Sequence, residues 1–294
     1  YSGDVITLPD AWDTVADCPA DNPESVNGPD DIIYVIYTSG TTGTPNGAML
    51  SHGIMTNLIK WQHEQTTIEG ALRCLQFTSV NFCVSFQETM STLTAGGELH
   101  LIGDIVRQDV NYLMEFLSRH KIQNLYLPFS YLNFLFNHPE QWGDTFQHDL
   151  KHIITAGEQL KITAGLKEFL DRHPHIHLHN HYGSSEMHVV ASYTLDASTA
   201  HKYPVPPAGK PVANTRIFIL DEYANPVTRG AWGELYVAGS FEVAGYINND
   251  ELTAQKLVEV PGLTGPGEKL YRSGDVGRWL EDGNIQFLGR LDHQ

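Results

Sequence analysis

The residue types best suited to chemistry stand in a short loop near the start of the chain. The loop reads Tyr37-Thr38-Ser39-Gly40-Thr41-Thr42-Gly43-Thr44-Pro45-Asn46-Gly47 and follows the apolar run 32–36, which predicts a buried strand. Glycines let backbone N–H groups approach an anion closely, and serine and threonine hydroxyls add further donors. The loop therefore predicts a nest for phosphate oxygens, although an ordinary flexible connection has the same composition.

The Walker type of phosphate loop is excluded at this position. That loop requires Lys-Ser or Lys-Thr directly after the second glycine of the pattern G-x-x-x-x-G. Counting from Gly40, Pro45 stands where the second glycine should be, and no lysine follows it. A phosphate nest of another kind remains.

Apolar periodicity predicts the elements that must position this loop. Helical spacing runs from His52 to about Gln65 and from Val110 to His120, and strand-like runs occupy 123–127, 152–155 and 176–179. Strands that alternate with helices predict a mostly parallel sheet flanked by helices, with ligands at the carboxyl ends of the strands. The loops 38–47, 157–158 and 182–186 each follow such a strand, so we expect them on one rim.

The chain divides into three predicted parts. Residues 1–30 carry Pro9, Pro19, Pro23 and Pro29 and are predicted to be a connector. Residues 31–212 are predicted to form an α/β core subdomain with the phosphate loop and a substrate pocket. Shorter strand-like runs at 216–220, 234–237, 277–280 and 285–288 predict a β-rich subdomain over residues 213–294.

Composition excludes several classes of protein. The formal charge of -17, from 18 Lys plus Arg against 35 Asp plus Glu, excludes a nucleic-acid partner because phosphate backbones need a positive surface. No apolar stretch reaches the roughly 20 residues of a membrane span, and the chain begins without a signal peptide. Three cysteines without C-x-x-C spacing favour neither disulfides nor zinc. We expect a soluble protein of the cytoplasm.

Six motifs in order carry a resemblance to a known family. They are the loop 37–47 with His52, then Phe82-Cys83-Val84-Ser85, Asn180-His181-Tyr182-Gly183-Ser184-Ser185-Glu186, Gly233-Glu234-Leu235-Tyr236-Val237-Ala238-Gly239, Tyr271-Arg272-Ser273-Gly274-Asp275 and Gly289-Arg290-Leu291-Asp292. The chain resembles the adenylate-forming enzymes, and most closely the adenylation domains of nonribosomal peptide synthetases. The motifs span nearly the whole chain.

The resemblance also implies parts that this chain lacks. In the family a further segment precedes the phosphate loop, and a small mobile C-terminal domain follows a hinge aspartate, whose counterpart is Asp292. We therefore expect a core fragment, either an isolated piece or the part of an interrupted domain before an insertion. The small domain carries a lysine needed in the transition state, so the fragment alone is expected to have low activity.

The implied reaction is attack of a carboxylate on the α-phosphorus of ATP, which gives an acyl-adenylate and pyrophosphate. Two anions repel each other, so phosphate charge must be neutralised, and Mg²⁺ suits this with one or two carboxylates. The resemblance implies Glu186 as the metal ligand, Ser185 as an α-phosphate contact and His52 as a third catalytic residue. By themselves, Glu186 fits a helix N-terminal charge and His52 a helix-capping region.

The resemblance further implies a set of nucleotide-binding residues. Tyr182 would lie against adenine and Asp275 would accept the ribose hydroxyls, although an aspartate after Gly274 is also an ordinary turn cap. The full set is Thr38, Ser39, Gly40, Thr41, Thr42, Gly43, Gly157, Glu158, Tyr182, Asp275, Phe287 and Arg290.

Two positions depart from the family pattern. Asn46 replaces the usual lysine of the phosphate loop, so ATP affinity or turnover is expected to suffer. Cys83 replaces the aspartate that pairs with the ammonium of an amino-acid substrate. A buried ammonium without a carboxylate costs several kcal/mol, so we expect an acid without an α-ammonium: an α-keto, α-hydroxy, aryl or phenylpropanoid-type acid. Cys83 also fits a plain small core residue.

The remaining pocket follows from the same resemblance. The implied substrate pocket is Phe82, Cys83, Val84, Gln87, Tyr126, Ile154, Ala156, His181, Val189 and Val190. The implied partner is an acyl or peptidyl carrier protein with a phosphopantetheine thiol, beside neighbouring synthetase modules. Four alternatives stay open: activation of an α-amino acid, activation of a β-amino acid, another adenylate-former such as an acyl-CoA ligase, and a degenerate, non-catalytic domain.

Overall fold

The computed structural model describes residue 16 and residues 18–38, 45–138, 140, 146–239 and 243–291. Residues 39–44 of the predicted phosphate loop, which include Ser39, Gly40, Thr41, Thr42 and Gly43, lie outside this described part, as does the hinge position Asp292. Residues 18–31 contain no helix or strand and are exposed. The division of the chain at residues 30 and 212 stays a prediction.

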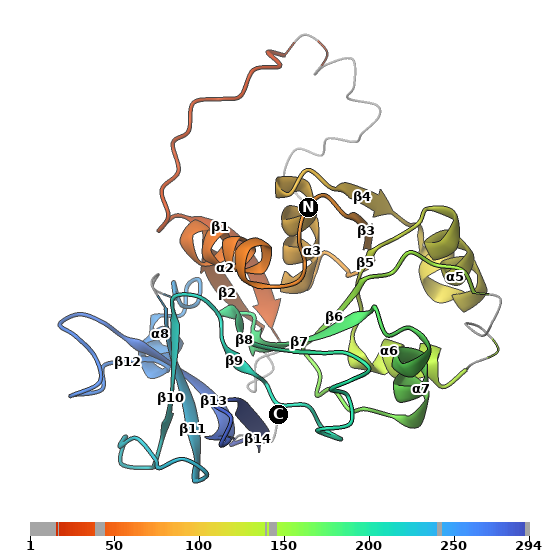
Figure 1. Cartoon of the computed structure of the whole chain (residues 1–294). Helices are drawn as coiled ribbons and strands as arrows, with labels where there is room; N and C mark the ends of the chain where they lie inside the picture. Colours follow the sequence, from red (N-terminus) through yellow and green to blue (C-terminus); the bar gives the residue numbers. More distant parts are fainter. Residues whose placement is uncertain are drawn as a thin grey trace.

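The largest sheet has seven strands in the order β4-β3-β5-β6-β7-β8-β9 (Figure 1). Their bounds are β3 Arg73–Gln76, β4 Glu98–Leu101, β5 Asn124–Tyr126, β6 His152–Ala156, β7 His177–Ser184, β8 His188–Leu195 and β9 Lys210–Pro211. β4, β3, β5, β6 and β7 pair in parallel, whereas β8 and β9 pair antiparallel. The expected mostly parallel sheet is confirmed.

Helices cover both faces of this sheet. They are α2 His52–Gln65, α3 Cys83–Thr94, α4 Asp104–Gln108, α5 Val110–Arg119, α6 Phe129–Phe136 and α7 Ala164–Arg172. Leu117 of α5, Leu132 of α6 and Phe169 of α7 pack against Ile153 and Leu178 of the sheet. On the other face, α3 contributes Val84 to the cluster around the strand residues Tyr126 and Ile154. The two predicted helices correspond to α2 and α5.

The second main sheet is antiparallel and β-rich, as expected. Its strands are β10 Thr215–Leu220, β11 Trp232–Gly239, β12 Leu257–Val258, β13 Leu270–Trp279 and β14 Ile285–Arg290, with the helix α8 at Asp250–Lys256. A buried cluster joins it to β8, because Val190 and Ala191 pack with Leu235, Tyr271 and Ile285. In the described part of the chain, no helix is long and apolar enough to cross a membrane.

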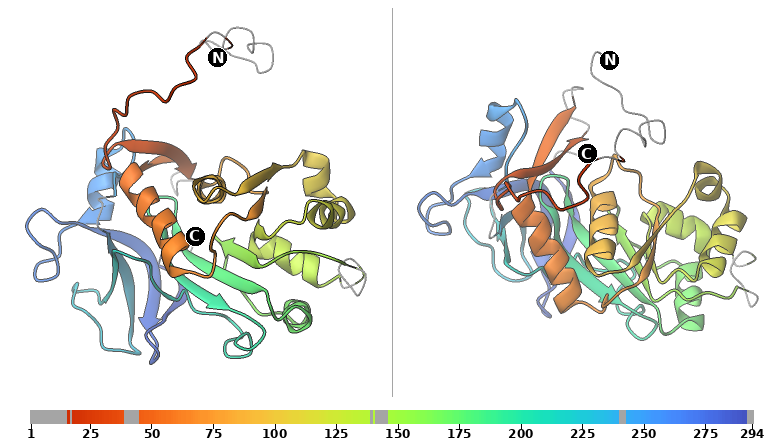
Figure 2. Two further views of the ribbon diagram at one scale, coloured as in Figure 1. Left: turned by 45° about the horizontal axis from the view of Figure 1, so that its top comes forward. Right: turned by 90° about the horizontal axis from the view of Figure 1, so that it is seen from above.

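The segment before the phosphate loop is a strand, as predicted, but the prediction that this strand is buried is wrong. β1 (Ile32–Thr38) pairs with β2 (Asn46–Ser51) in a two-stranded antiparallel ribbon, outside the parallel sheet. The ribbon lies beside α2 and reaches the segment that leads into α8 (Figure 2). Ile32 and Val35 are exposed, because only one side of a ribbon rests on the protein. An apolar run of five residues cannot distinguish these two environments.

The predicted loop 182–186 is wrong in part, because β7 continues to Ser184. β8 begins at His188, so β7 and β8 form an antiparallel hairpin with a short turn that contains Ser185 and Glu186. The register shifts between Tyr182 and Gly183. A Cβ at Gly183 would lie 1.6 Å from the carbonyl oxygen of His188, so only glycine permits this close approach.

Candidate functional site

A cavity of about 860 Å³ at the junction of the two sheets is lined by part of the predicted site. Its predicted lining residues are Thr38, Phe82, Cys83, Val84, Ile154, Ala156, Gly157, Glu158, Ser185, Glu186, Val189 and Arg290. Other lining residues include Asn46, Ser184, His188, Tyr246, Lys256 and Tyr271. The ends of the β1–β2 ribbon, the β7–β8 turn and the start of α3 thus face one space, although β1 lies outside the parallel sheet.

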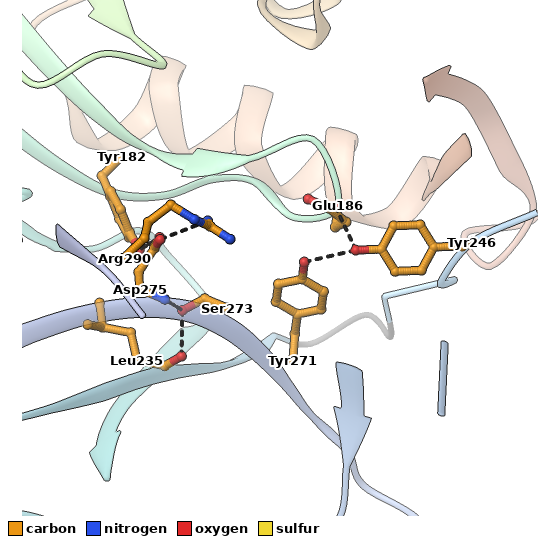
Figure 3. Close-up of polar contacts among 8 residues, drawn as sticks. All are labelled: Tyr182, Glu186, Leu235, Tyr246, Tyr271, Ser273, Asp275 and Arg290. Atoms are coloured by element: carbon orange, nitrogen blue, oxygen red, sulfur yellow. Dashed lines mark hydrogen bonds and ion pairs between the residues drawn. The ribbon is translucent and has the colours of Figure 1, made fainter. Parts of the chain in front are cut away.

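Glu186 accepts a hydrogen bond from Tyr246, which in turn contacts Tyr271. The Tyr246 hydroxyl donates to Glu186 Oε1 at 2.7 Å and lies 3.2 Å from the Tyr271 hydroxyl (Figure 3). Burial, and then the nearby Glu186 carboxylate, raises the pKa of both tyrosines, so both stay protonated. The β7–β8 turn therefore presents a carboxylate with one oxygen bound by Tyr246.

Asp275 lies in a second polar group beside the cavity. Its carboxylate accepts a hydrogen bond from the Tyr182 hydroxyl and forms an ion pair with Arg290, whose Nη1 lies 2.9 Å from Asp275 Oδ1 (Figure 3). The Asp275 N–H donates to Ser273 Oγ at 3.0 Å, and that hydroxyl donates to the Leu235 carbonyl oxygen at 2.7 Å. Asp275 is therefore fixed at both backbone and side chain, and Arg290 extends from it to the cavity wall.

Several predicted site residues are not among the described residues that line the cavity. Phe287 packs beside Tyr182, with ring centroids 5.8 Å apart. His52 is the first residue of α2. Val190 belongs to the core between the sheets. None of these three, nor Tyr182 or Asp275, lines the described part of the cavity.

Glu158 has a structural role that sequence reasoning missed. Its carboxylate accepts from the Ser130 N–H at 2.6 Å and from the Ser130 hydroxyl at 3.0 Å. The helix α6 begins after Pro128, which has no side-chain oxygen to cap it, so Glu158 supplies the cap from another loop. Gly157 beside it has φ +81°, a backbone conformation that favours glycine.

Three other predicted pocket residues form a neutral network beneath the lining. Gln87 Nε2 donates to Gln62 Oε1 at 2.7 Å and lies 3.4 Å from His181 Nδ1. Gln62 Nε2 donates to the Tyr126 hydroxyl at 3.1 Å, and Ser91 Oγ lies 3.2 Å from the same hydroxyl. Burial lowers the pKa of His181 to about 3, so its ring is neutral at neutral pH. We call these five residues the floor network.

Cys83 is the first residue of α3 and lines the cavity above this network. Burial raises the pKa of the Cys83 thiol to about 11, so the side chain is neutral at neutral pH. Among the described lining residues, the carboxylates are Glu158 and Glu186. Glu158 caps α6 and Glu186 is bound by Tyr246, so neither replaces the aspartate that is absent at position 83.

Lys256 is a cation that sequence reasoning missed. It is the last residue of α8 and lines the cavity together with Thr38 and Asn46. Arg107 and Arg290, the other cationic residues of the lining, form ion pairs with Asp104 and Asp275. No described acidic side chain forms an ion pair with Lys256. Local sequence around α8 gave no signal for this, since a lysine in the last turn of a helix is common.

Glu88 supports the cavity wall from the interior of α3. This fully buried carboxylate accepts from the backbone N–H groups of Phe77 and Thr78, at 2.9 and 3.2 Å. Phe77 and Thr78 line the cavity after β3. Burial raises the pKa of Glu88 to about 8. The sequence signal was a glutamate inside an otherwise uncharged helix.

His188 also lines the cavity and was missed, although it stands two residues after the Glu186 motif. It is 2% exposed, and burial lowers its pKa to about 4. Tyr271 begins the motif 271–275, but the motif did not predict its contact with Tyr246. Tyr246 had no local signal, because its contact with Glu186 joins residues 60 positions apart.

The sequence is similar to known synthetases. A family model described as AMP-binding enzyme matches residues 4–247. Tyrocidine synthase 2 of Brevibacillus parabrevis is 46% identical over 271 residues, which are 92% of this chain and 7% of that protein. Gramicidin S synthase 2 of Brevibacillus brevis is 46% identical over 269 residues, which are 92% of this chain and 6% of that protein. The chain thus spans less than a tenth of the length of these curated relatives.

Solved structures share the fold. One matches with a TM-score of 0.80 at 27% identity. It is the holo form of a nonribosomal peptide synthetase (NRPS) protein that contains adenylation and peptidyl carrier protein (PCP) domains and is bound to a vinylsulfonamide inhibitor. The match covers 93% of this chain and 46% of that one. Another structure of an NRPS protein containing adenylation and PCP domains gives a TM-score of 0.79 at 26% identity.

Proposed function

We propose, since the chain belongs to the AMP-binding enzyme family, that it activates a carboxylic acid with ATP as an acyl-adenylate, within a nonribosomal peptide synthetase. One observation carries the proposal: the β7–β8 turn, β14 and α8 line the cavity with Glu186, Arg290 and Lys256, whereas α3 and β6 line it with uncharged residues that include Cys83. A polyanion suits the first part of the lining and the carbon skeleton of an uncharged acid suits the second. We call these the phosphate end and the acid end.

At the phosphate end, the residues fit the charges of a nucleotide. Arg290 and Lys256 offset negative charge on phosphate oxygens, and Ser185 offers a hydroxyl to the α-phosphate. The rings of Tyr182 and Phe287 would pack against the adenine, and the Asp275 carboxylate would accept hydrogen bonds from the ribose hydroxyls. The ribose role requires its hydroxyls to share Asp275 with Tyr182 and Arg290.

Glu186 suits a magnesium ion on the chemistry of its site. Tyr246 occupies Oε1, which leaves Oε2 without a described partner. No group of three or more His, Cys, Asp or Glu side chains among the described residues could hold a metal by itself. Mg²⁺ is commonly bound by one or two carboxylates together with substrate phosphates, so one carboxylate suffices here. Bound Mg²⁺ would neutralise phosphate charge and hold the phosphates in line.

At the acid end, the proposed substrate lacks an α-ammonium. Its carboxylate would lie beside Ser185, whose side chain contacts the Cys83 thiol, and its carbon skeleton would lie against Val84, Ile154 and Ala156. The neutral Cys83 thiol offers no counter-charge for an ammonium, and a buried unpaired charge costs several kcal/mol. An α-keto, α-hydroxy or aryl acid avoids this cost.

The acceptor of the acyl group is proposed to be a carrier-protein thiol. The solved relatives are NRPS proteins that contain both adenylation and PCP domains, which supports a carrier partner for this chain. Transfer of the acyl group to a phosphopantetheine thiol would release AMP.

Pyrophosphate exchange with the full-length protein tests the proposed function. A panel of matched pairs, each an α-keto acid and the amino acid with the same side chain, is compared with no acid. We expect exchange that depends on Mg²⁺ and favours the keto acid of a pair. Exchange with the amino acid alone would overturn the proposed substrate class, whereas no exchange with any acid would overturn the activity.

A further inference from the structure

The backbone of His188 adopts a conformation that few side chains tolerate. Its φ is 56°, in the left-handed region, which residues other than glycine adopt uncommonly, although histidine is found there more often than most. Such strain costs about 1–3 kcal/mol and persists where the surrounding structure enforces it, which is frequently at functional sites. Contacts of His188 with the rest of the fold must therefore compensate for this conformation.

The imidazole ring of His188 connects two parts of the cavity wall. The Val189 N–H donates to His188 Nδ1 at 2.9 Å, so Nδ1 carries no proton. Nε2 of the neutral ring therefore carries the proton, and it donates to the Cys83 carbonyl oxygen at 3.0 Å. The ring thus links β8 to the first residue of α3.

A second contact confines the same residue from the other side. The carbonyl oxygen of His188 lies so close to Gly183 of β7 that no Cβ would fit between them. The short turn with Ser185 and Glu186 therefore starts from a backbone fixed by Gly183 and ends at one fixed by the Cys83 link. The end of the turn is thus held to α3, and the start of the turn is held to its end.

We propose that His188 is a positioning residue: its hydrogen bond to the Cys83 carbonyl sets the distance between the acid end and the Ser185-Glu186 turn of the phosphate end. The consequence for turnover rests on the function proposed above, because the acid carboxylate must meet the α-phosphate between these two walls. Reacting atoms must stand about 3–3.5 Å apart, so a small displacement of either wall reduces the rate strongly.

A matched pair of variants separates this role from a general contribution to the core. His188→Gln keeps an N–H donor at the Nε2 position, and His188→Met has nearly the same length and shape without a donor. Both side chains bear the same backbone strain, so a difference between the two variants reports the hydrogen bond to Cys83. Thermal unfolding of both variants checks that they lose similar stability.

The first measurement does not depend on activity and uses the cysteines of the chain. Cys83 is half-buried, Cys74 is buried and Cys18 is exposed, so alkylation by iodoacetamide, followed by mass spectrometry, reads three environments at once. We expect Cys83 to react about three- to tenfold faster in His188→Met than in His188→Gln, the factor that one hydrogen bond allows. Cys74 and Cys18 should react equally in both. Equal Cys83 rates, or a parallel rise at Cys74, would overturn the proposal.

The second measurement is kinetic and uses the full-length protein. We expect the KM for the acid to rise and kcat to fall in His188→Met, with recovery in His188→Gln and with equal ATP dissociation constants in the two. A loss of kcat that is the same in both variants contradicts the positioning role. If no acid supports exchange in the wild type, the proposed function fails, but the Cys83 alkylation rates still decide the link between His188 and α3.

Discussion

The two ends of the cavity differ in how their polar groups are held. At the phosphate end, Glu186 and Asp275 each accept a hydrogen bond from a tyrosine hydroxyl. Arg290 and Lys256 add positive charge there. At the acid end, the floor network contains amides, hydroxyls and one neutral imidazole, with no ionised group. One cavity therefore combines a charged surface with an uncharged one.

This difference follows from the elements that build each end. The phosphate end lies where the β7–β8 turn meets β13, β14 and α8, so its groups come from both sheets. The acid end lies within the α/β sheet, between α2, α3 and the parallel strands, where a charge would be expensive to bury. Ionised groups at the junction therefore come from both sheets, whereas the floor network inside the layered core contains none. Five predictions, in order of decreasing effect, test this separation.

The first and largest effect should come from Glu186→Gln. If Glu186 holds Mg²⁺ as proposed, loss of its charge is expected to cost about 3 kcal/mol, or roughly a hundredfold in adenylation rate. The measurement is pyrophosphate exchange against Mg²⁺ concentration, and the apparent Mg²⁺ affinity should fall as well. Glu251→Gln, at an exposed position of α8, is the control, and equal rates in the two variants would contradict a metal role.

The second prediction concerns the stability of the protein at acid pH, where His181 of the floor network stays neutral only in the folded state. Burial lowers the pKa of His181 to about 3, so below pH 6.5 the unfolded chain binds a proton that the folded chain excludes. Stability is therefore full above pH 6.5 and falls as pH decreases towards 3, by about 2 kcal/mol at pH 5 for this one group.

His181→Gln isolates the contribution of this residue from those of His148, His152 and His188, whose pKa values are also lowered by burial. Urea unfolding at pH 5 and pH 7 measures the free energy of unfolding. The difference between the two pH values should be smaller in the variant. An identical difference would mean that His181 is not buried as a neutral ring.

The third prediction introduces a charge at the acid end through Cys83→Asp. Amino-acid exchange should rise, and exchange with the neutral acid of the same pair should fall, because a buried carboxylate now needs an ammonium. The swing should exceed about tenfold, which is roughly 1.4 kcal/mol. Cys83→Ser, neutral and of similar size, should show no swing. A wild type that already prefers the amino acid of each pair would refute the interpretation.

The fourth prediction removes a charge from the phosphate end through Lys256→Met. Loss of one cation from the β- and γ-phosphates should weaken ATP binding about tenfold and leave AMP binding nearly unchanged. Calorimetric titration of both nucleotides measures this, with Lys202→Met, an exposed lysine outside the cavity, as the control. Equal weakening of ATP and AMP binding would place Lys256 away from the outer phosphates.

The fifth and smallest effect should come from Tyr126→Phe in the floor network. Gln62 and Ser91 lose their shared hydroxyl partner, which should lower the free energy of unfolding by about 1 kcal/mol. Tyr112→Phe, at an exposed position of α5, should leave stability unchanged. Denaturant unfolding of both variants provides the comparison, and similar values for the two would argue against a cooperative floor network.

Local pattern predicted the elements that bury one continuous face. In α5, Val110, Leu113 and Leu117 repeat at helical spacing and all lie in the core. The runs at 123–127 and 152–155 form parallel strands whose apolar residues Leu125, Ile153 and Ile154 are buried in the sheet. β1 has the same apolar character, but its partner is β2, and pairing partners are not encoded in the run itself.

In the candidate site too, contact partners could not be predicted from local sequence, because the partners lie far apart in the chain. The contacts between Glu186 and Tyr246, between Asp275 and Tyr182, and between Gln87 and His181 join residues 60, 93 and 94 positions apart. Motif order predicted that Glu186 and Asp275 would share a site, yet it gave no information on which hydroxyl each would accept. Such pairings depend on how two sheets meet, and a local sequence pattern carries no record of that junction.

The amino-acid sequence specifies the chemical group at each site position: a carboxylate at 186, a thiol at 83 and an amide at 46. It also determined the mostly parallel sheet, because periodicity and strand spacing are local properties of the chain. Only the tertiary structure decided that Glu158 caps a helix, that Lys256 lines the cavity and that His188 links β8 to α3. These outcomes depend on distance and burial, which arise when segments far apart in the chain pack together.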